Sequence, residues 1–435
     1  MALWGASYVF VGDCRVCVTR SGFLVSDAKS IRMSEPSEMR APVSVPPPLQ
    51  SDEFDDPYPH LAAARRRSAV ATAWPLPVAT GAPELGPIYS VLAYDESVQV
   101  LRDHETYSSR GLSEAMGPLF AGAIIAMDEP EHRLYRALVA PAFRPKVLER
   151  WQTTVVQPAI DNVIDTFIDH DRVDLVEHLT FAFPVRVIAR ILGLPEQDVA
   201  TFQRWSLDLI NMFNDPELGV RALEEFRSYF MAFITERRLA PRDDLISDLI
   251  RSEVDGHRLD DDAIFASVKM LLPAGVETTY RSLGNLLVGL LTHTDQLHAL
   301  QHDRALIGPA IEEGLRWQTP FLMVARQTTR DTDLAGIHIP ADQHVFIFVA
   351  AANHDERRYP DPEAFNISRA ATAHIAFGTG PHICLGMHLT RVESHAALER
   401  ILDRAPNIRL DPDEPEPRIR GTVLRSPDAV NVLLR

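Results

Sequence analysis

The chain has 435 residues, of which 46% are hydrophobic and 24% are charged, as in an ordinary globular protein. Lys+Arg 43 against Asp+Glu 60 gives a formal net charge of -17, which argues against nucleic-acid binding because nucleic-acid-binding proteins carry a basic face. No stretch approaches the roughly 18 apolar residues of a membrane span, and three cysteines make no disulfide framework, so a cytoplasmic protein is expected.

The first fifty residues differ from the rest of the chain. They contain Cys14 and Cys17, without the second pair of ligands that a zinc site needs. The proline-rich segment MSEPSEMRAPVSVPPPLQ is typical of disorder. We expect an N-terminal extension over residues 1–50, either disordered or upstream of a natural start at Met33 or Met39, and one domain over residues 51–435.

Beyond residue 50, helical patterns dominate. A strand is expected at GPIYSVLAY, followed by helices along RALVAPAFRPKVLERWQTTVVQPAIDNVIDTFI and DDAIFASVKMLLPAGVETTYRSLGNLLVGLLTH, where apolar residues recur every three or four positions. Pro273 and Gly275 predict a kink in the second of these helices. Further strands are expected along ARQTTRDTDLAGIHIPADQHVFIFVAA, so the predicted fold is mainly α with small β-sheets.

Cys384 lies in the segment FGTGPHICLG, immediately before a helical pattern. Gly378 and Gly380 permit backbone angles that other residues resist, and Pro381 stiffens the backbone after them. The N–H groups at the start of the next helix are expected to lower the pKa of the Cys384 thiol and stabilise a thiolate. A thiolate held in this way is suited to binding a metal. The alternative is a buried, inert cysteine in a glycine turn.

The pattern F-G-x-G-x-H-x-C-x-G, from Phe377 to Gly386, resembles the haem-binding signature of the cytochrome P-450 family. The resemblance implies a single triangular haem domain that binds haem b, with Cys384 as the axial thiolate ligand of the iron. It also implies that Phe377 and Gly378 lie against the cofactor and that His382 hydrogen-bonds a haem propionate. This pattern is far more specific than a lone cysteine.

Two further segments resemble parts of the family that bind the haem propionates. His132 and Arg136, four residues apart in DEPEHRLYRALVAPAF, match an H-x-x-x-R helix, and Arg326 falls where a third propionate ligand is expected. Buried carboxylates need such cationic partners. Each residue alone could equally be a solvated charge, so these assignments depend on Cys384.

Glu313 and Arg316 form an E-x-x-R motif, which resembles the structural ion pair of the family. On its own such a pair is common on any charged helix face. Ala364 stands at the position where the family often adds a further arginine. Arg357, Arg358 and Arg369 are the candidates to take its place, and a weaker network is the alternative.

The segment Ala274-Gly275-Val276-Glu277-Thr278-Thr279 is similar to the A-G-x-[ED]-T-T segment that the family places over the distal haem face. The resemblance implies that Ala274 and Gly275 lie against the haem. Thr278 can donate and accept a proton, and Glu277 can turn between solvent and pocket, so both are predicted catalytic residues. The alternative for Thr278 is a hydrogen bond to its own helix.

The resemblance also indicates which segments line a substrate pocket. It includes the loop over residues 112–125 and six single residues: Phe321, Met323, Val324, Met212, Phe213 and Leu424. Their apolar character favours a hydrophobic substrate, although ordinary core packing gives the same composition.

The predicted function is a monooxygenase that inserts one oxygen atom from dioxygen into a small organic molecule, by hydroxylation or epoxidation. The haem domain fills the chain, so electrons are expected from a separate ferredoxin or flavodoxin and its reductase, with NAD(P)H used only through that reductase. A monomer is expected. A basic face for the partner, or a scatter of solvated charges, is formed by Arg133, Arg144, Lys146, Arg150 and Arg391. The alternatives are a haem-thiolate gas sensor or carrier and a peroxygenase driven by hydrogen peroxide.

Overall fold

The computed structural model describes residues 56–76, 88–111, 120–210, 215–421 and 423–435, together with two strands near the start. These strands, β1 (Tyr8–Val11) and β2 (Cys14–Cys17), pair as an antiparallel hairpin. The rest of residues 1–50 lies outside the described residues. The structure therefore does not test the predictions that this extension is disordered or that it precedes a natural start at Met33 or Met39.

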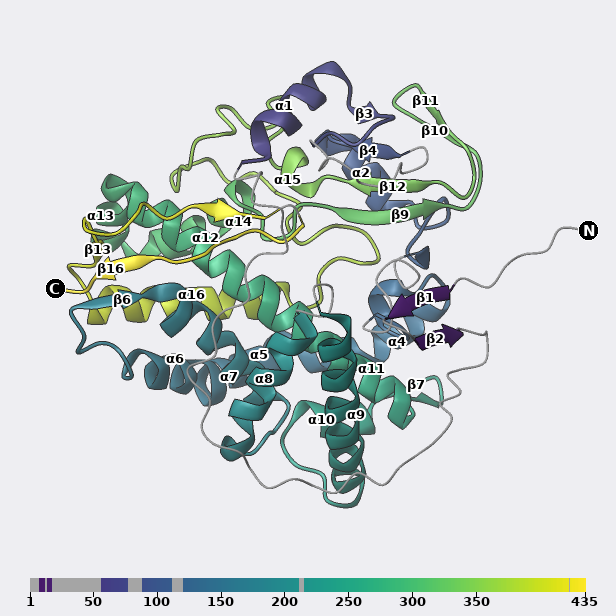
Figure 1. Cartoon of the computed structure of the whole chain (residues 1–435), viewed down its shortest axis with the longest axis horizontal. Helices are drawn as coiled ribbons and strands as arrows, with labels where there is room; N and C mark the ends of the chain where they lie inside the picture. The colour runs from purple at the N-terminus through teal and green to yellow at the C-terminus, as the bar shows by residue number, and fades with distance from the viewer. Residues whose placement is uncertain are drawn as a thin grey trace, which may run out of the picture.

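Helices make up most of the described chain, which confirms the predicted fold class (Figure 1). The α-helices are α1 (Tyr58–Arg67), α2 (Tyr94–Arg102), α4 (Glu131–Val139), α5 (Pro145–Trp151), α6 (Gln157–Ile164), α7 (Ala182–Ile191), α8 (Val199–Ile210), α9 (Pro216–Leu239), α10 (Leu245–Arg251), α11 (Asp261–Leu272), α12 (Thr278–Thr292), α13 (Thr294–His302), α14 (Ile307–Trp317), α15 (Val349–Ala352) and α16 (Met387–Arg404). Short 3₁₀ turns are η2 (Ile124–Ala126), η3 (Ala140–Phe143), η6 (Glu196–Asp198) and η9 (Arg304–Leu306), and π turns are η4 (Gln152–Val156), η5 (Val176–Phe181) and η8 (Pro273–Glu277).

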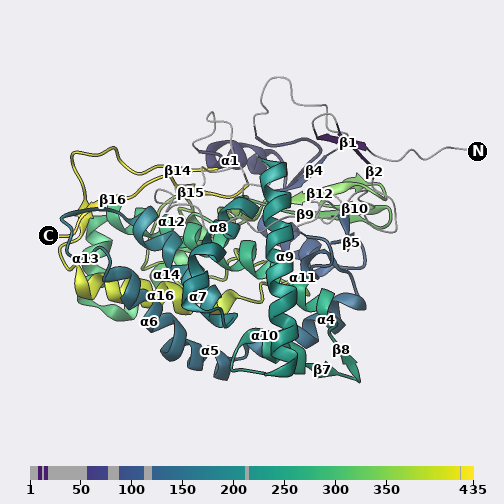
Figure 2. The ribbon, with the colours of Figure 1, turned by 60° about the horizontal axis from the view of Figure 1, so that its bottom comes forward.

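Several helices begin at an aspartate whose side chain accepts a backbone hydrogen bond. Asp215, Asp244 and Asp260 each accept from the N–H three residues further on, at the starts of α9, α10 and α11. These bonds satisfy N–H groups that have no partner within the helix. Figure 2 shows the 24-residue α9 running across the molecule beside α11.

The largest sheet contains both regions in which strands are predicted. Its order is β3 (Val70–Ala71), β4 (Tyr89–Val91), β12 (His344–Ile347), β9 (Val324–Thr328) and β5 (Tyr107–Ser108). β12 runs parallel to β4 and antiparallel to β9, with Val345 opposite Arg326. This sheet lies with α1, α2 and α15 in the upper part of Figure 1, above the helices α5 to α11.

The other sheets are small. A three-stranded sheet has the order β13 (Arg409–Leu410), β16 (Asn431–Leu433) and β6 (Arg172–Asp174). Two-stranded sheets pair β7 (Glu253–Val254) with β8 (His257–Arg258), β10 (Thr332–Leu334) with β11 (Ile337–Ile339), and β14 (Ile419–Arg420) with β15 (Ser426–Pro427).

The first long helical pattern forms helices, as predicted, but they are separated by a short turn. α4 ends at Val139, and the 3₁₀ turn η3 separates it from α5. Pro141 lies inside that turn and Pro145 opens α5. Proline lacks a backbone N–H and clashes with the preceding helical turn, so it interrupts a helix even where the apolar spacing continues.

The predicted kink in the second long helix is present. α11 and α12 are joined by the π turn η8, which begins at Pro273. A Cβ atom on Gly275 would lie 2.8 Å from Cδ1 of Ile188 in α7, so the glycine allows this turn to pack closely against its neighbour. All of α12 from Thr279 to Leu291 is buried, as expected for the central helix of a large core. No helix among the described residues is long and apolar enough to cross a membrane.

Candidate active site

The cysteine loop has the backbone geometry that its glycines predict. Gly378 and Gly380 have φ angles of 67° and 75°, in the left-handed region that glycine adopts without strain. A Cβ atom on Gly380 would lie 2.5 Å from the carbonyl oxygen of Leu101, whereas one on Gly378 would meet open space. The Cys384 N–H donates to the Phe377 carbonyl over 2.8 Å, which closes the loop immediately before α16.

The expectation of a lowered thiol pKa is wrong for the chain without a bound metal. Burial raises the pKa of the Cys384 thiol. The N–H groups of Gly386 and Met387 act in the predicted direction, as do Arg136 and Arg391, but they do not outweigh burial. A cation placed against the sulfur would reverse this balance, because a metal-bound thiol loses its proton.

The four predicted propionate-binding residues come together beside this loop. The rings of His132, from α4, and His382 are 3.9 Å apart between centroids. Arg136, one turn further along α4, donates from Nη2 to the carbonyl of Ile383 over 2.6 Å. Burial, followed by Arg326, His132 and Arg136, lowers the pKa of His382 to about 3. Without an anion beside it, the His382 ring is therefore held neutral next to the two guanidinium groups of Arg136 and Arg326.

Ser109 and Asp128 belong to this cluster, and sequence reasoning missed both. The Ser109 hydroxyl lies 3.2 Å from Nε2 of His382. Asp128 accepts from the Ser109 N–H over 2.8 Å and from the Ser108 hydroxyl over 2.5 Å, which ties the end of β5 to the start of α4. Nothing in their sequence neighbourhood distinguishes these residues from ordinary turn residues.

This arrangement fits a haem, whose propionates are anionic. Nε2 of His132 is buried and has no hydrogen-bond partner within the described residues. Arg326 is 9% exposed, and burial lowers the pKa of its guanidinium to about 10. Buried cations and an unpartnered ring nitrogen are costly unless an anion lies between them. The open side of Gly378 and the Cys384 sulfur complete a cradle for a planar group with a central metal.

The predicted catalytic pair lies where the π turn ends: Glu277 is the last residue of η8, and Thr278 is the first residue of α12. The Thr278 hydroxyl donates to the Ala274 carbonyl over 2.7 Å, the bond to its own helix that was the alternative for this residue. Such a bond does not prevent the hydroxyl from accepting a proton. Ala274 is exposed to open space, whereas the side of Gly275 is covered by Ile188. The catalytic and haem-contact roles of these residues remain predictions.

Glu277 is buried rather than turned to solvent. Its carboxylate accepts from Nε of Arg281 over 2.6 Å, and Arg281 was not singled out from the sequence. The spacing of four residues was the available signal, because it places both side chains on one helix face.

The predicted Glu313–Arg316 ion pair is present and buried. Nε and Nη2 of Arg316 each donate to the Glu313 carboxylate over 2.8 Å. Arg369 completes the network, with Nε 3.2 Å from both carboxylate oxygens. Of the three candidates to replace the arginine absent at Ala364, the structure therefore selects Arg369.

Two of the predicted pocket segments meet in the structure. Phe321 and Leu424 form an isolated antiparallel bridge, and the Leu322 N–H donates to the Val423 carbonyl over 2.8 Å. Met323 and Val324 come next, at the start of β9, and are half-buried. Met212 and Phe213, and residues 112–119 of the predicted loop, lie outside the described residues.

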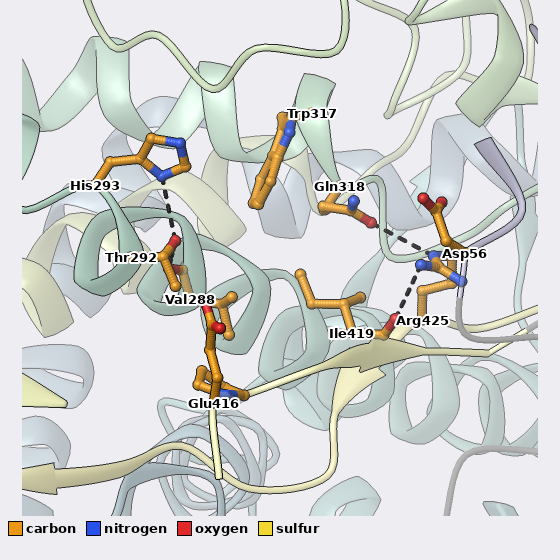
Figure 3. A pocket seen from close by; sticks show the side chains of 10 residues that line it. Asp56, Val288, Thr292, His293, Trp317, Gln318, Glu416, Ile419 and Arg425 are labelled. Atoms are coloured by element: carbon orange, nitrogen blue, oxygen red, sulfur yellow. Dashed lines mark hydrogen bonds between the residues drawn. The ribbon is translucent and has the colours of Figure 1, made fainter. Parts of the chain in front are cut away.

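One of two cavities lies apart from this arrangement, and the other adjoins it. The pocket in Figure 3, of about 410 Å³, is lined by Val288 and Thr292 of α12, Trp317 of α14 and Ile419 of β14, and by no residue predicted for the active site. A second cavity, of about 570 Å³, opens beside the cysteine loop. Its lining includes Phe377, Ile383, Met387, Arg391 and Glu312.

Three of the five cations expected on a basic face are paired with carboxylates. Arg150 lies 2.6 Å from Asp243, Arg391 lies 2.6 Å from Glu312, and Arg133 lies 3.6 Å from Glu129. These pairs reduce the positive charge that this face presents. The Arg391 guanidinium also lies 4.7 Å from the centre of the Phe377 ring.

The fold and the cysteine loop define a haem-thiolate protein. The cytochrome P450 family model matches residues 185–433, and the chain belongs to this family. It is 34% identical over 392 residues to cytochrome P450 monooxygenase PikC of Streptomyces venezuelae, covering 86% of this chain and 91% of that protein. It is also 34% identical to the steroid C26-monooxygenase of Mycobacterium tuberculosis, covering 74% and 87%.

A solved structure gives the same result for the fold. CYP109E1 from Bacillus megaterium, in complex with testosterone, superposes with a TM-score of 0.79 at 30% identity, covering 87% of this chain and 99% of that one. The chain is therefore an oxygen-incorporating oxidoreductase of the cytochrome P450 class, whose family binds haem and acts on small molecules with dioxygen.

Proposed function

We propose that this monooxygenase hydroxylates or epoxidises a hydrophobic organic molecule, with electrons from a separate ferredoxin or flavodoxin and its reductase. NAD(P)H then serves only through that reductase. The observation that carries the proposal is the convergence of the Cys384 loop, a buried cation cluster and the Glu277–Thr278 pair in one fold. Relatives named as polyketide and steroid oxygenases support a hydrophobic substrate.

The cation cluster would hold the haem and fix its orientation. His132, Arg136, Arg326 and His382 would bind the propionates, and the Cys384 sulfur would bind the iron. When bound, a haem with a thiolate ligand supplies the centre at which dioxygen is reduced and activated. The remaining chemistry of this chain is to position the substrate and move protons.

Thr278 and Glu277 would carry out the proton transfer. The Thr278 hydroxyl can accept a proton with its lone pairs while it donates to the Ala274 carbonyl, and it can exchange that donor bond for one toward the pocket. Glu277, the preceding residue, provides a carboxylate that can take up another proton from water after each transfer. Phe321, Val324 and Leu424 would meanwhile exclude bulk water from the substrate side.

The ligation is tested by an optical spectrum of the purified protein. After reduction and exposure to carbon monoxide, the wild-type protein should show the red-shifted Soret band that is diagnostic of thiolate ligation. Cys384→Ser should lose that band, because a hydroxyl is a poor iron ligand. A wild-type protein that takes up no haem, or that gives the spectrum of a different axial ligand, would overturn the proposal.

The monooxygenase activity is tested by replacing Thr278 with alanine. We expect product formed per dioxygen consumed to fall by roughly 10²-fold, with hydrogen peroxide released instead, because positioned proton transfer contributes about that factor. Thr292→Ala is the matched control, since the Thr292 hydroxyl makes the same bond to the carbonyl four residues earlier, in Val288, but lies at the far end of α12. Its product yield should be that of the wild type.

Two results would favour the other functions. A gas sensor or carrier would bind its ligand unchanged in Thr278→Ala and show no electron-driven turnover in the wild type. A peroxygenase would turn over on hydrogen peroxide alone and gain nothing from ferredoxin and reductase. Either result would contradict the proposal.

A further inference from the structure

The acidic residue of the proton-transfer pair lies in a buried cluster. Glu277, Tyr280, Arg281 and Ser426 are 2%, 1%, 1% and 3% exposed. Nε of Arg281 donates to Oε1 of Glu277 over 2.6 Å, and its Nη2 forms an ion pair with the same oxygen. The Tyr280 hydroxyl donates to Oε1 as well, over 3.4 Å. All three contacts are therefore made by a single carboxylate oxygen.

The other carboxylate oxygen of Glu277, Oε2, has different surroundings. It is buried and has no hydrogen-bond partner within the described residues. A buried carboxylate oxygen without a partner is unfavourable unless water or a proton donor reaches it. Oε2 is thus the atom of Glu277 that is available to exchange a proton, while Oε1 is occupied.

The Arg281 side chain also forms a hydrogen bond with a residue that is far away in the sequence. Its Nη1 donates to the Ser426 hydroxyl over 2.7 Å, and Ser426 lies in β15, 145 positions further along. β15 can approach α12 because residue 284 is a glycine, where a Cβ atom would lie 3.2 Å from the Pro427 ring. The position of the guanidinium therefore depends on the packing of β15, not only on the helix that carries it.

The remaining neighbours supply no second acid or base to this cluster in the contacts that the structure describes. The turn η5 contributes the Phe181 ring, 5.4 Å from that of Tyr280. Burial and the Glu277 charge raise the pKa of Tyr280, so its phenol stays protonated and acts only as a donor. Arg281 is the cation that these contacts place on Glu277.

We propose that Arg281, held by Ser426, is a positioning residue for proton delivery: it fixes Glu277 through Oε1 and leaves Oε2 to carry the proton. The inference rests on the proposed function. A proton taken by Oε2 from water on the solvent side is passed on toward Thr278, and Glu277 returns to the carboxylate. Arg281 takes no part in the transfer itself and holds the carboxylate in place through Oε1.

The test compares Arg281→Met, Arg281→Lys and Ser426→Ala in the holoenzyme. In Arg281→Met the loss of the cation favours the protonated carboxylic acid, so an infrared band of a protonated carboxyl should appear in the resting enzyme at neutral pH. In turnover, product per dioxygen should fall about tenfold, and the limb of its pH profile that Glu277→Gln abolishes should move to higher pH by one unit or more. Arg281→Lys should restore most of both properties.

Ser426→Ala leaves the Glu277–Arg281 ion pair in place. The inference can therefore still be tested if Arg281→Met does not fold. It should shift the same limb in the same direction by a smaller amount. Ser282→Ala is the matched control, because the Ser282 hydroxyl lies in the same helix but donates to the Thr279 carbonyl. Its infrared spectrum and pH profile should be those of the wild type.

The double variant Glu277→Gln/Arg281→Met shows whether Arg281 acts through Glu277. The product that it forms per dioxygen consumed should be no lower than that of Glu277→Gln alone. A further loss in the double variant, or an unshifted profile in both Arg281→Met and Ser426→Ala, would overturn the inference. Failure of the proposed function is recognised separately, by a wild-type protein without the thiolate spectrum or without product, whereas the infrared band is read without turnover.

Discussion

Arg369 shows how one side chain substitutes for another from a different sequence position. Its Nη2 donates to the carbonyl of Ala364 over 2.9 Å, so the guanidinium returns to the residue where the family arginine is absent. Of the other two candidates, Arg357 is paired with Asp355, and the Arg358 guanidinium lies 3.9 Å from the centre of the Tyr94 ring. Three arginines within thirteen positions are equivalent in the sequence, and only the chain path distinguishes them.

Replacing Arg369 by methionine should destabilise the protein without leaving Glu313 unpaired. Glu313 keeps Arg316 as a partner, so the loss is that of charge-assisted hydrogen bonds rather than of a whole buried pair. We expect the free energy of unfolding to fall by about 1–3 kcal/mol. Thermal or denaturant unfolding measures this. Arg251→Met removes an exposed pair with Asp248 and should change it by less than about 0.5 kcal/mol; equal effects would contradict the buried network.

For individual helices, strands and turns, the sequence predicted where the backbone turns, but it did not predict how deeply the side chains are buried. The glycines of the cysteine loop and the proline of η8 predicted their turns, because only those residues suit the required backbone. Pro141 and Pro145 carry the same signal where α4 gives way to α5, although the sequence analysis did not use them to place that boundary. The thiol pKa was mispredicted for a related reason: a helix start can be seen in the sequence, whereas the burial that outweighs it cannot.

Pairings between elements were the hardest part to predict. The Glu277–Arg281 spacing is visible, but its burial beneath Ser426 depends on how β15 packs against α12. The place of Arg326 likewise depends on the register of β9 with β12, where it lies opposite Val345. The resemblance to the family located Arg326, and the residues by themselves did not.

Across the whole molecule, the candidate cofactor site joins segments that are far apart in sequence. His132 and Arg136 come from α4, Arg326 from β9, and His382 with Cys384 from the loop before α16. The chain as a whole carries a net charge of -17, yet Arg136 and Arg326 bring two guanidinium groups to this site, and both act on the His382 ring. In the haem-free protein these two positive charges therefore repel each other.

This repulsion predicts opposite effects of one substitution in the two states of the protein. Arg326 is a buried cation that donates to the adjacent Ala325 carbonyl, and burial lowers its pKa to about 10. Removing it as Arg326→Met should leave the haem-free chain as stable as before or more stable, because a buried charge is replaced by an apolar side chain. Within the described residues Arg326 forms no ion pair, and the charge of Asp128 offsets only part of the cost of burial. In the haem-bound protein the same change removes a propionate partner, so the stabilisation by haem, which follows RT ln(1 + [L]/Kd), should shrink by about 1–3 kcal/mol. Calorimetry of the haem-extracted and haem-bound forms of both proteins measures the difference. A residue that only supports the sheet would destabilise both forms equally, and that result would remove Arg326 from the haem site.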